Sequence, residues 1–192
     1  MGREFELKFQ ATPAIQQALA STYGPFREIR METTYFDTPN GDLSSRKITL
    51  RCRKENDITV CTLKTPHADG GRGEWECQAA NLSEGLPQLL AMGAPKGPVL
   101  LALSGVVPVC GARFVRLAAT LPTADGTAEL ALDLGVLTGG GREQPLCEVE
   151  LEQKTGSDAA TASLAKELSS QFGLVPEAKS KFRRALRLAQ GE

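Results

Sequence analysis

Several features that mark common protein classes are missing from this sequence of 192 residues. No apolar run approaches the ~18 residues that a transmembrane helix needs, and charged residues begin at position 3, which argues against a secretory signal. The formal net charge of −1 provides no basic field of the kind that attracts nucleic acid. We therefore expect a cytoplasmic protein that binds neither membranes nor nucleic acid.

Side chains for the commonest catalytic and metal sites are also scarce. The one histidine, His67, falls in a loop-like stretch where a surface position is expected, so a Ser/His/Asp triad is excluded. The P-loop pattern G-x-x-x-x-G-K-[ST] is absent. The cysteines contain no C-x-x-C pair, which disfavours zinc, and their odd number indicates reduced thiols; they are Cys52, Cys61, Cys77, Cys110 and Cys147.

What the sequence does contain is alternation of apolar and polar residues with a period of two, which is typical of β-strands. The pattern predicts eight strands, at 3–9, 28–37, 48–54, 58–64, 72–77, 112–121, 128–134 and 146–153. Most are joined by short turns, which favours antiparallel hairpins. Helices are predicted at 14–21, within 83–103, at 157–172 and at 178–188. With neither a linker nor a repeat, we expect one stand-alone domain spanning 1–192.

Charged residues occupy one face of several predicted strands, while the other face is apolar. Residues two apart share a face, and the polar sets that carry these charges are Glu4-Glu6-Lys8, Arg51-Arg53, Thr62-Lys64, Arg72-Glu74-Glu76 and Glu148-Glu150-Glu152. An ordinary solvated sheet face, as in a protein-interaction domain, is one interpretation. However, like charges ~7 Å apart are unfavourable unless opposite charge lies between them. This favours faces that enclose a ligand.

These patterns predict an α+β fold: an eight-stranded antiparallel β-barrel, or tunnel, with a charged interior and helices packed outside. Such an interior must hold water or ligand, because unpaired buried charges are costly. Carboxylates suit Mg²⁺ or Mn²⁺, whereas arginine and lysine suit phosphate oxygens. A linear triphosphate with its metal ion satisfies both halves.

The block E-F-E-L-K at Glu4–Lys8 resembles the E-x-E-x-K signature of the CYTH family, the triphosphate tunnel metalloenzymes. Further blocks follow in order, namely YFDTP, TLRCR, TLK, RGEWE, ALDLG, CEVELE and SKFRRALRL, so the resemblance covers nearly the whole chain. One departure is Lys47, which stands where the family block often has glycine.

The resemblance implies roles for individual residues. Metal ligands would be Glu4, Glu6, Asp133, Glu148 and Glu150. Phosphate-binding residues would be Lys8, Arg51, Arg53, Lys64, Arg116 and Lys181. Catalysis would centre on Glu4, Glu6, Lys8 and Glu150. The roles of Glu74, Glu76 and Glu152 stay open. Arg113 and Arg116 lie on opposite faces of their strand, and we favour Arg116 as the inward residue.

Aromatic residues make up only 5% of the chain, so a pocket for an organic group is poorly supplied. We therefore expect hydrolysis of inorganic triphosphate to pyrophosphate and phosphate by a monomer or homodimer. The enzymatic alternatives are a class IV-type adenylate cyclase and a nucleoside or thiamine triphosphatase. The non-enzymatic alternative is a polyphosphate-binding module.

Overall fold

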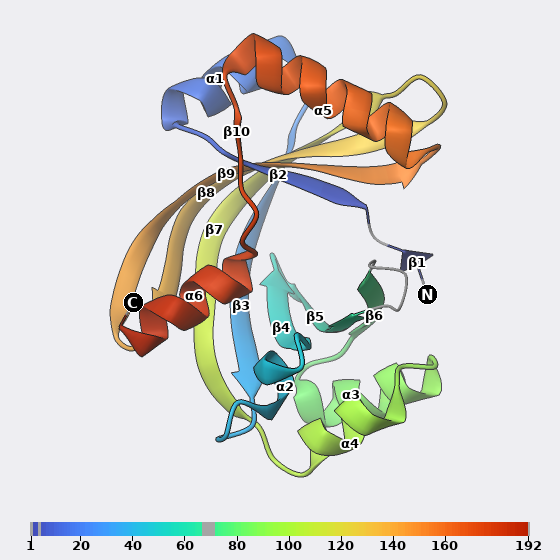
Figure 1. The fold of residues 1–192 in the computed structure, drawn as a ribbon, viewed down its shortest axis with the longest axis vertical. Coiled ribbons are helices and arrows are strands. Elements are labelled where there is room, and N and C mark those ends of the chain that lie inside the picture. Colours follow the sequence, from blue (N-terminus) through green and yellow to red (C-terminus); the bar gives the residue numbers. More distant parts are fainter. Residues whose placement is uncertain (1, 4, 67–71, 192) are drawn as a thin grey trace.

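The computed structural model describes residues 2–3, 5–66 and 72–191, with the side chains from Phe5 onward. Its main feature is one antiparallel sheet, in the order β1-β6-β5-β4-β3-β7-β8-β9-β2-β10 (Figure 1). The strands are β1 (Gly2–Arg3), β2 (Glu6–Gln10), β3 (Arg27–Asp37), β4 (Thr49–Glu55), β5 (Ile58–Pro66), β6 (Arg72–Gln78), β7 (Val107–Pro122), β8 (Thr127–Gly139), β9 (Arg142–Thr155) and β10 (Val175–Pro176). The predicted α+β class and antiparallel pairing are confirmed.

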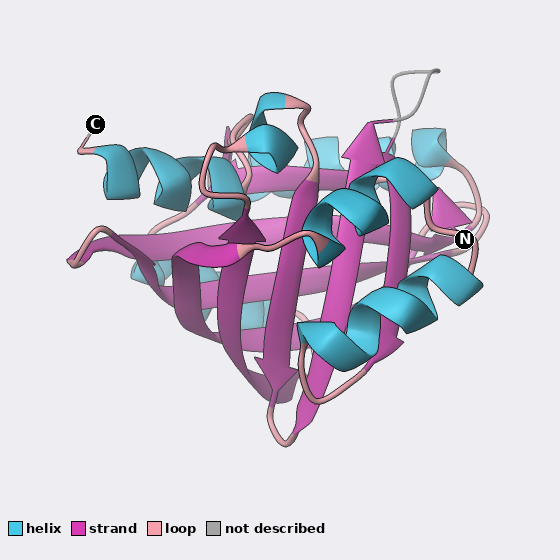
Figure 2. Cartoon of the chain, turned by 90° about the horizontal axis from the view of Figure 1, so that it is seen from below, coloured by secondary structure: helices cyan, strands magenta, loops and turns pink. Residues whose placement is uncertain are grey.

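The sheet is strongly curved, as Figure 2 shows. Within the described residues its hydrogen-bonded order is open, running from β1 to β10. The first residues of the chain nevertheless contact strands towards both ends of this order, because β1 pairs with β6 while β2 pairs with β9. The first predicted strand is thus divided in two. With the short β10, this gives ten described strands where eight were predicted.

Three strands extend well beyond their predicted ends, and β7 is one of them, because it begins at Val107. The other two form a hairpin: β8 continues to Gly139 and β9 begins at Arg142, so the turn contains Gly140 and Gly141. Both glycines have positive φ angles, 57° and 74°, as a two-residue hairpin turn of the primed type requires. The alternation fades here because residues 142–145 are exposed and Gly139 has no side chain, although Leu137 is buried in the core shared with α6 (Lys181–Gln190).

The helices are α1 (Pro13–Thr22), α2 (Asp42–Ser45), α3 (Leu82–Ala91), α4 (Lys96–Leu103), α5 (Asp158–Phe172) and α6 (Lys181–Gln190). The side chains of Thr12 and Ser157 cap α1 and α5, and Gly173 ends α5, as the sequence indicates. None of the described helices is long and apolar enough to cross a membrane.

The short helix α2 was not predicted from the sequence. It is anchored by the buried Asp37, whose carboxylate accepts hydrogen bonds from the backbone N–H groups of Thr38, Leu43 and Ser44. Lys47 follows with a φ of 59°, a conformation that favours glycine. The YFDTP block therefore fixes the turn that leads into β4.

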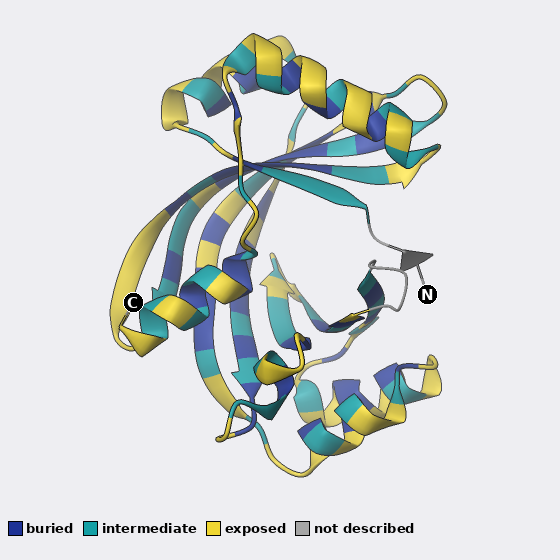
Figure 3. Ribbon diagram, in the orientation of Figure 1, coloured by how far each residue is buried: buried dark blue, intermediate teal, exposed yellow. Residues whose placement is uncertain are grey.

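Four helices cover the convex side of the sheet. Residues of α1 and α5 share a core with β8 and β9, and α3 and α4 cover β4, β5 and β6 (Figure 3). α6 differs from the predicted outside position, because Phe182 and Ala185 pack against inward residues of β3 and β7. Gly139 permits this approach, since a Cβ there would lie 2.5 Å from the Ala185 carbonyl oxygen.

Candidate functional site

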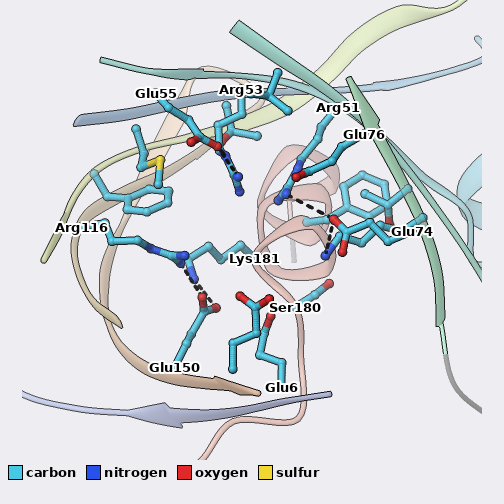
Figure 4. Close-up of a pocket in the computed structure, with 18 of the residues that line it drawn as sticks. Glu6, Arg51, Arg53, Glu55, Glu74, Glu76, Arg116, Glu150, Ser180 and Lys181 are labelled. Atoms are coloured by element: carbon cyan, nitrogen blue, oxygen red, sulfur yellow. Dashed lines mark hydrogen bonds and ion pairs between the residues drawn. The ribbon is translucent and has the colours of Figure 1, made fainter. Parts of the chain in front are cut away.

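A cavity of about 410 Å³ lies on the concave side of the sheet (Figure 4). It is lined by nine basic and seven acidic side chains of the described residues. The basic ones are Lys8, Arg27, Arg51, Arg53, Lys64, Arg72, Arg116, Lys154 and Lys181, and the acidic ones are Glu6, Glu55, Glu74, Glu76, Glu129, Glu150 and Glu152. The charged faces therefore enclose a space, and the interpretation as a solvated sheet face is wrong.

The basic side of the cavity belongs to β4 and β5. Arg51 and Arg53 are two residues apart on β4, and Lys64 lies 3.2 Å from a Glu74 carboxylate oxygen. Burial, and then the neighbouring Arg51, lower the pKa of Arg53, although its Nε donates to Glu55 at 2.7 Å. The charged form of Arg53 is therefore disfavoured first by burial and then by a neighbouring cation, and a bound anion would stabilise it.

The acidic side belongs to β2 and β9. The ladder places Glu6 directly opposite Glu152, and Lys8 opposite Glu150. Lys8 Nζ lies 3.1 Å from the Glu6 carboxylate. Burial alone would lower the pKa of Lys8, but Glu6 and Glu150 raise it on balance. In Figure 4, Glu6 and Glu150 lie across the cavity from Arg51 and Arg53.

Behind the acidic side is a buried ionic cluster around the α6 residue Lys181. Its Nζ lies 2.8 Å from Asp133, 2.5 Å from Glu148 and 2.6 Å from Glu150. Burial would lower the pKa of Lys181, yet Glu150, Asp133 and Glu148 raise it well above 10.5. The ammonium is therefore charged and held by three carboxylates.

Two arginines complete this cluster. Arg116 donates to both oxygens of Asp133 at 2.7 Å and also contacts Glu150. Arg184, one helical turn after Lys181, contacts Glu148. Residues three apart share a helix face, so the spacing in SKFRRALRL could have identified Arg184, which our sequence analysis missed. Three carboxylates are thus matched by three cations.

The structure also shows which predicted site residues come together. Lys8, Arg51, Arg53, Lys64, Arg116 and Lys181 line the cavity with Glu6 and Glu150. Asp133 and Glu148 are fully buried behind it. Arg113 lies outside, exposed and paired with Glu143. Glu4 and His67 lie outside the described residues.

The residues left open before now have positions. Glu74, Glu76 and Glu152 all line the cavity, and Glu74 pairs with Lys64. Lys154 Nζ lies 2.9 Å from Glu152, and Glu129 stands opposite Glu152 in the ladder. Glu129 and Lys154 were not identified from the sequence, because the alternation in their strands gives no sign of which ends reach the cavity.

The carboxylate oxygens are the type of ligand that a hard divalent cation prefers, but only some of them are placed where a cation could reach them. Asp133, Glu148 and Glu150 offer oxygens within 4.8 Å of one another, but the Lys181 ammonium lies at their centre. Glu6 and Glu150 face the open cavity. A cation bound from the cavity would therefore meet Glu6 and Glu150 first, and ligation by Asp133 or Glu148 would require Lys181 to leave.

Fold and site together define a class of protein in which a curved antiparallel sheet encloses a cavity lined with opposite charges. A model of the CYTH domain family matches residues 2–186, so the chain belongs to this family. An inorganic triphosphatase from Haemophilus influenzae is 27% identical over 164 residues, which cover 82% of this chain and 47% of the relative. The chain therefore spans about half the length of this curated relative.

Solved structures share the fold. One is a proposed adenylyl cyclase from Hippeastrum, described as having a dominant triphosphatase activity. It has a TM-score of 0.66, 22% identity, and coverage of 96% of this chain and 95% of that one. A protein from Pyrococcus horikoshii has a TM-score of 0.65, 21% identity, and coverage of 96% and 99%. At these identities the similarity shows the fold alone.

Proposed function

We propose that this protein is a metal-dependent triphosphatase of the cytoplasm that hydrolyses inorganic triphosphate to pyrophosphate and phosphate. The observation that supports this most directly is the division of the cavity, with Arg51 and Arg53 on one side and Glu6 and Glu150 on the other. Guanidinium groups bind phosphate oxygens, and carboxylates bind the cation that accompanies a polyphosphate. The relative from Haemophilus influenzae, an inorganic triphosphatase, agrees with this proposal.

The basic residues would bind the phosphate chain. Arg51, Arg53 and Lys64 would hold the phosphate oxygens from one side, while Lys8 would do so from the other. Arg116 and Lys181 have raised pKa values and remain charged, so they would stabilise negative charge that develops on the reacting phosphate. This binding aligns the triphosphate along the cavity.

Mg²⁺ or Mn²⁺ bound at Glu6 and Glu150 would neutralise charge on the leaving pyrophosphate. Water attacks the terminal phosphorus in line and the bond to the bridging oxygen breaks, which gives phosphate and pyrophosphate. A carboxylate on the acidic side would orient this water, and Glu6, Glu150 and Glu152 all line the cavity on that side. Glu4, the first residue of the E-x-E-x-K block, stays a predicted metal ligand.

A second candidate substrate is an organic triphosphate, which one observation favours. Ile29, Met31 and Phe114 line the cavity and form an apolar wall beside Arg116. A base or a thiamine ring could pack against such a wall. Hydrolysis of a nucleoside or thiamine triphosphate, or cyclisation of ATP, would use the same charged residues.

Release of phosphate and pyrophosphate from inorganic triphosphate, ATP and thiamine triphosphate, with Mg²⁺, Mn²⁺ or a chelator, tests the proposal. We expect the fastest turnover with inorganic triphosphate and none with chelator. Glu6→Gln should remove turnover, whereas Glu28→Gln, on an exposed face of β3, should not. Binding of triphosphate without turnover in any metal would instead indicate a polyphosphate-binding module.

A further inference from the structure

Three of the five cysteines form a row across neighbouring strands, away from the cavity. Cys52 on β4 is directly opposite Cys61 on β5, and Cys61 is directly opposite Cys77 on β6. All five cysteines are free thiols in the structure. The row lies on the convex side of the sheet beneath α3, where a Cβ at Gly85 would be 2.9 Å from Cys61 Sγ.

Directly opposite residues of antiparallel strands have Cα atoms about 4.5–5.5 Å apart. Disulfides join Cα atoms about 4.4–6.8 Å apart. Cys52 and Cys61 therefore need little backbone movement to form a bond.

The two thiols of this pair differ in chemistry. Interaction with the neighbouring Cys61 thiol lowers the pKa of Cys52, whereas interaction with Cys52, together with burial, raises the pKa of Cys61. Cys52 is half-buried and Cys61 is fully buried. Because the thiolate is the nucleophile and needs access to its oxidant, Cys52 is the reactive member of the pair.

Cys77 is a poorer partner for Cys61. Its thiol donates to the Gly85 carbonyl oxygen at 3.6 Å, which holds it against α3. Burial raises the pKa of Cys77. The order of reactivity within the row therefore begins at Cys52.

We propose that Cys52 and Cys61 are a redox modification site, which a hydroperoxide converts to an intramolecular disulfide. The Cys52 thiolate attacks a peroxide oxygen and breaks the O–O bond, which gives a sulfenic acid and releases water or an alcohol. The Cys61 sulfur then attacks the Cys52 sulfur and displaces water. Both thiols are oxidised, and the peroxide is reduced by their two electrons. A thiol reductant reverses the bond.

The position of the pair links it to the cavity on the other side of the sheet. Cys52 stands between Arg51 and Arg53, both of which line the cavity. A disulfide must bring the facing Cβ atoms closer than the ordinary cross-strand distance of about 4.5–5.5 Å. Oxidation would therefore draw β4 towards β5 by only about 1 Å where its arginines face the cavity, and a displacement of that size can slow a reaction severalfold or more.

Peptide mass mapping after treatment with hydrogen peroxide, followed by alkylation, tests the site itself. We expect a Cys52–Cys61 linkage that lacks the two thiol hydrogens and that disappears with dithiothreitol. It should persist in Cys77→Ser and be absent from Cys52→Ser, whose folding is checked by circular dichroism. A Cys61–Cys77 linkage, or a sulfenic acid at Cys52 without any linkage, would overturn the proposal.

Cys147→Ser is the matched control, because Cys147 is also half-buried but stands opposite Leu134 instead of a cysteine. It should form the Cys52–Cys61 linkage like the wild type. A second measurement, which rests on the proposed triphosphatase activity, compares rates before and after peroxide. We expect a several-fold loss in the wild type and in Cys147→Ser, restored by reductant, and none in Cys52→Ser. An equal loss of activity in Cys52→Ser would show that this cysteine pair does not cause the loss. If the protein had no triphosphatase activity, the peptide mapping would still test the disulfide.

Discussion

Lys181 on α6 places its Nζ 2.6 Å from a carboxylate oxygen of Glu150 on β9, although 31 residues separate them in the chain. The contact is buried, and Asp133 and Glu148 surround the same ammonium. The last helix is thus joined by charge to the acidic side of the cavity. Its position on the concave side depends on this contact as well as on apolar packing of Phe182.

Replacing Lys181 with methionine should destabilise the fold strongly. The change leaves three buried carboxylates with only Arg116 and Arg184, and breaking a buried ion pair costs about 3–5 kcal/mol. Urea unfolding at pH 7 measures the loss, and Lys166→Met on the exposed side of α5 serves as its control. Because the pKa of Lys181 is raised in the folded state, its contribution to the free energy of unfolding is complete at neutral pH and is lost only in strong alkali. Equal stability of the two variants would contradict this role.

The neighbouring carboxylates Glu150 and Glu148 should respond to pH in opposite directions. Burial would raise the pKa of Glu150, but Lys181 and Arg116 hold it well below 4.5. Its contribution to stability is therefore complete above the unfolded pKa of about 4.3 and is lost as the pH falls through the folded value. For Glu148, burial outweighs Lys181 and raises the pKa, so the ionised form is disfavoured.

We therefore expect Glu150→Gln to lose more stability at pH 7 than Glu148→Gln. From pH 7 towards pH 3, in chelator, the cost of Glu150→Gln should shrink. The stability of the wild type relative to Glu148→Gln should instead improve as the pH falls through the raised pKa. Unfolding curves for the three proteins measure both trends, and parallel trends for the two variants would contradict the assigned shifts.

Arg116 and Arg113 lie three residues apart on β7, so they face opposite sides of the sheet. Arg116→Ala should lower the free energy of unfolding by about 3–5 kcal/mol, because Asp133 and Glu150 lose a buried partner. Arg113→Ala removes an exposed pair with Glu143 and should change it by no more than about 0.5 kcal/mol. Isothermal titration with inorganic triphosphate should likewise show weaker binding for Arg116→Ala alone. Matching losses would mean that the inward side had been misassigned.

Much of this site was predictable because a strand alternates its faces by backbone geometry alone. Once Arg51 and Arg53 were placed on one face, Cys52 had to be on the other. The same argument placed Glu150 with Glu152 and separated Arg116 from Arg113. The order of the blocks along the chain then linked the strands to the CYTH family.

The position of α6 could not be predicted in this way. An amphipathic helix shows that one side is buried, but not which surface of the sheet receives it. The close packing of α6 against β8 depends on Gly139, which lies far from α6 in the sequence. For Arg184, the helical spacing from Lys181 indicates the shared face, but its partner Glu148, 36 residues away, is not evident from the sequence. Side-chain pairing over such distances is set by tertiary packing.

Gln16 on α1 supports the acidic cluster from the convex side. Its Nε2 donates to the backbone carbonyl oxygens of Asp133 at 2.9 Å and Glu148 at 2.8 Å, and the side chain is buried. Gln16→Ala leaves two carbonyl groups without this donor, which should cost about 1–3 kcal/mol of unfolding free energy. Gln17→Ala removes the same side chain from the exposed face of the same helix and should cost little. Because Asp133 and Glu148 hold Lys181, faster amide hydrogen exchange in α6 of Gln16→Ala, with α6 of Gln17→Ala unchanged, would show that this support reaches the cavity. Unchanged exchange in both would confine Gln16 to packing of α1.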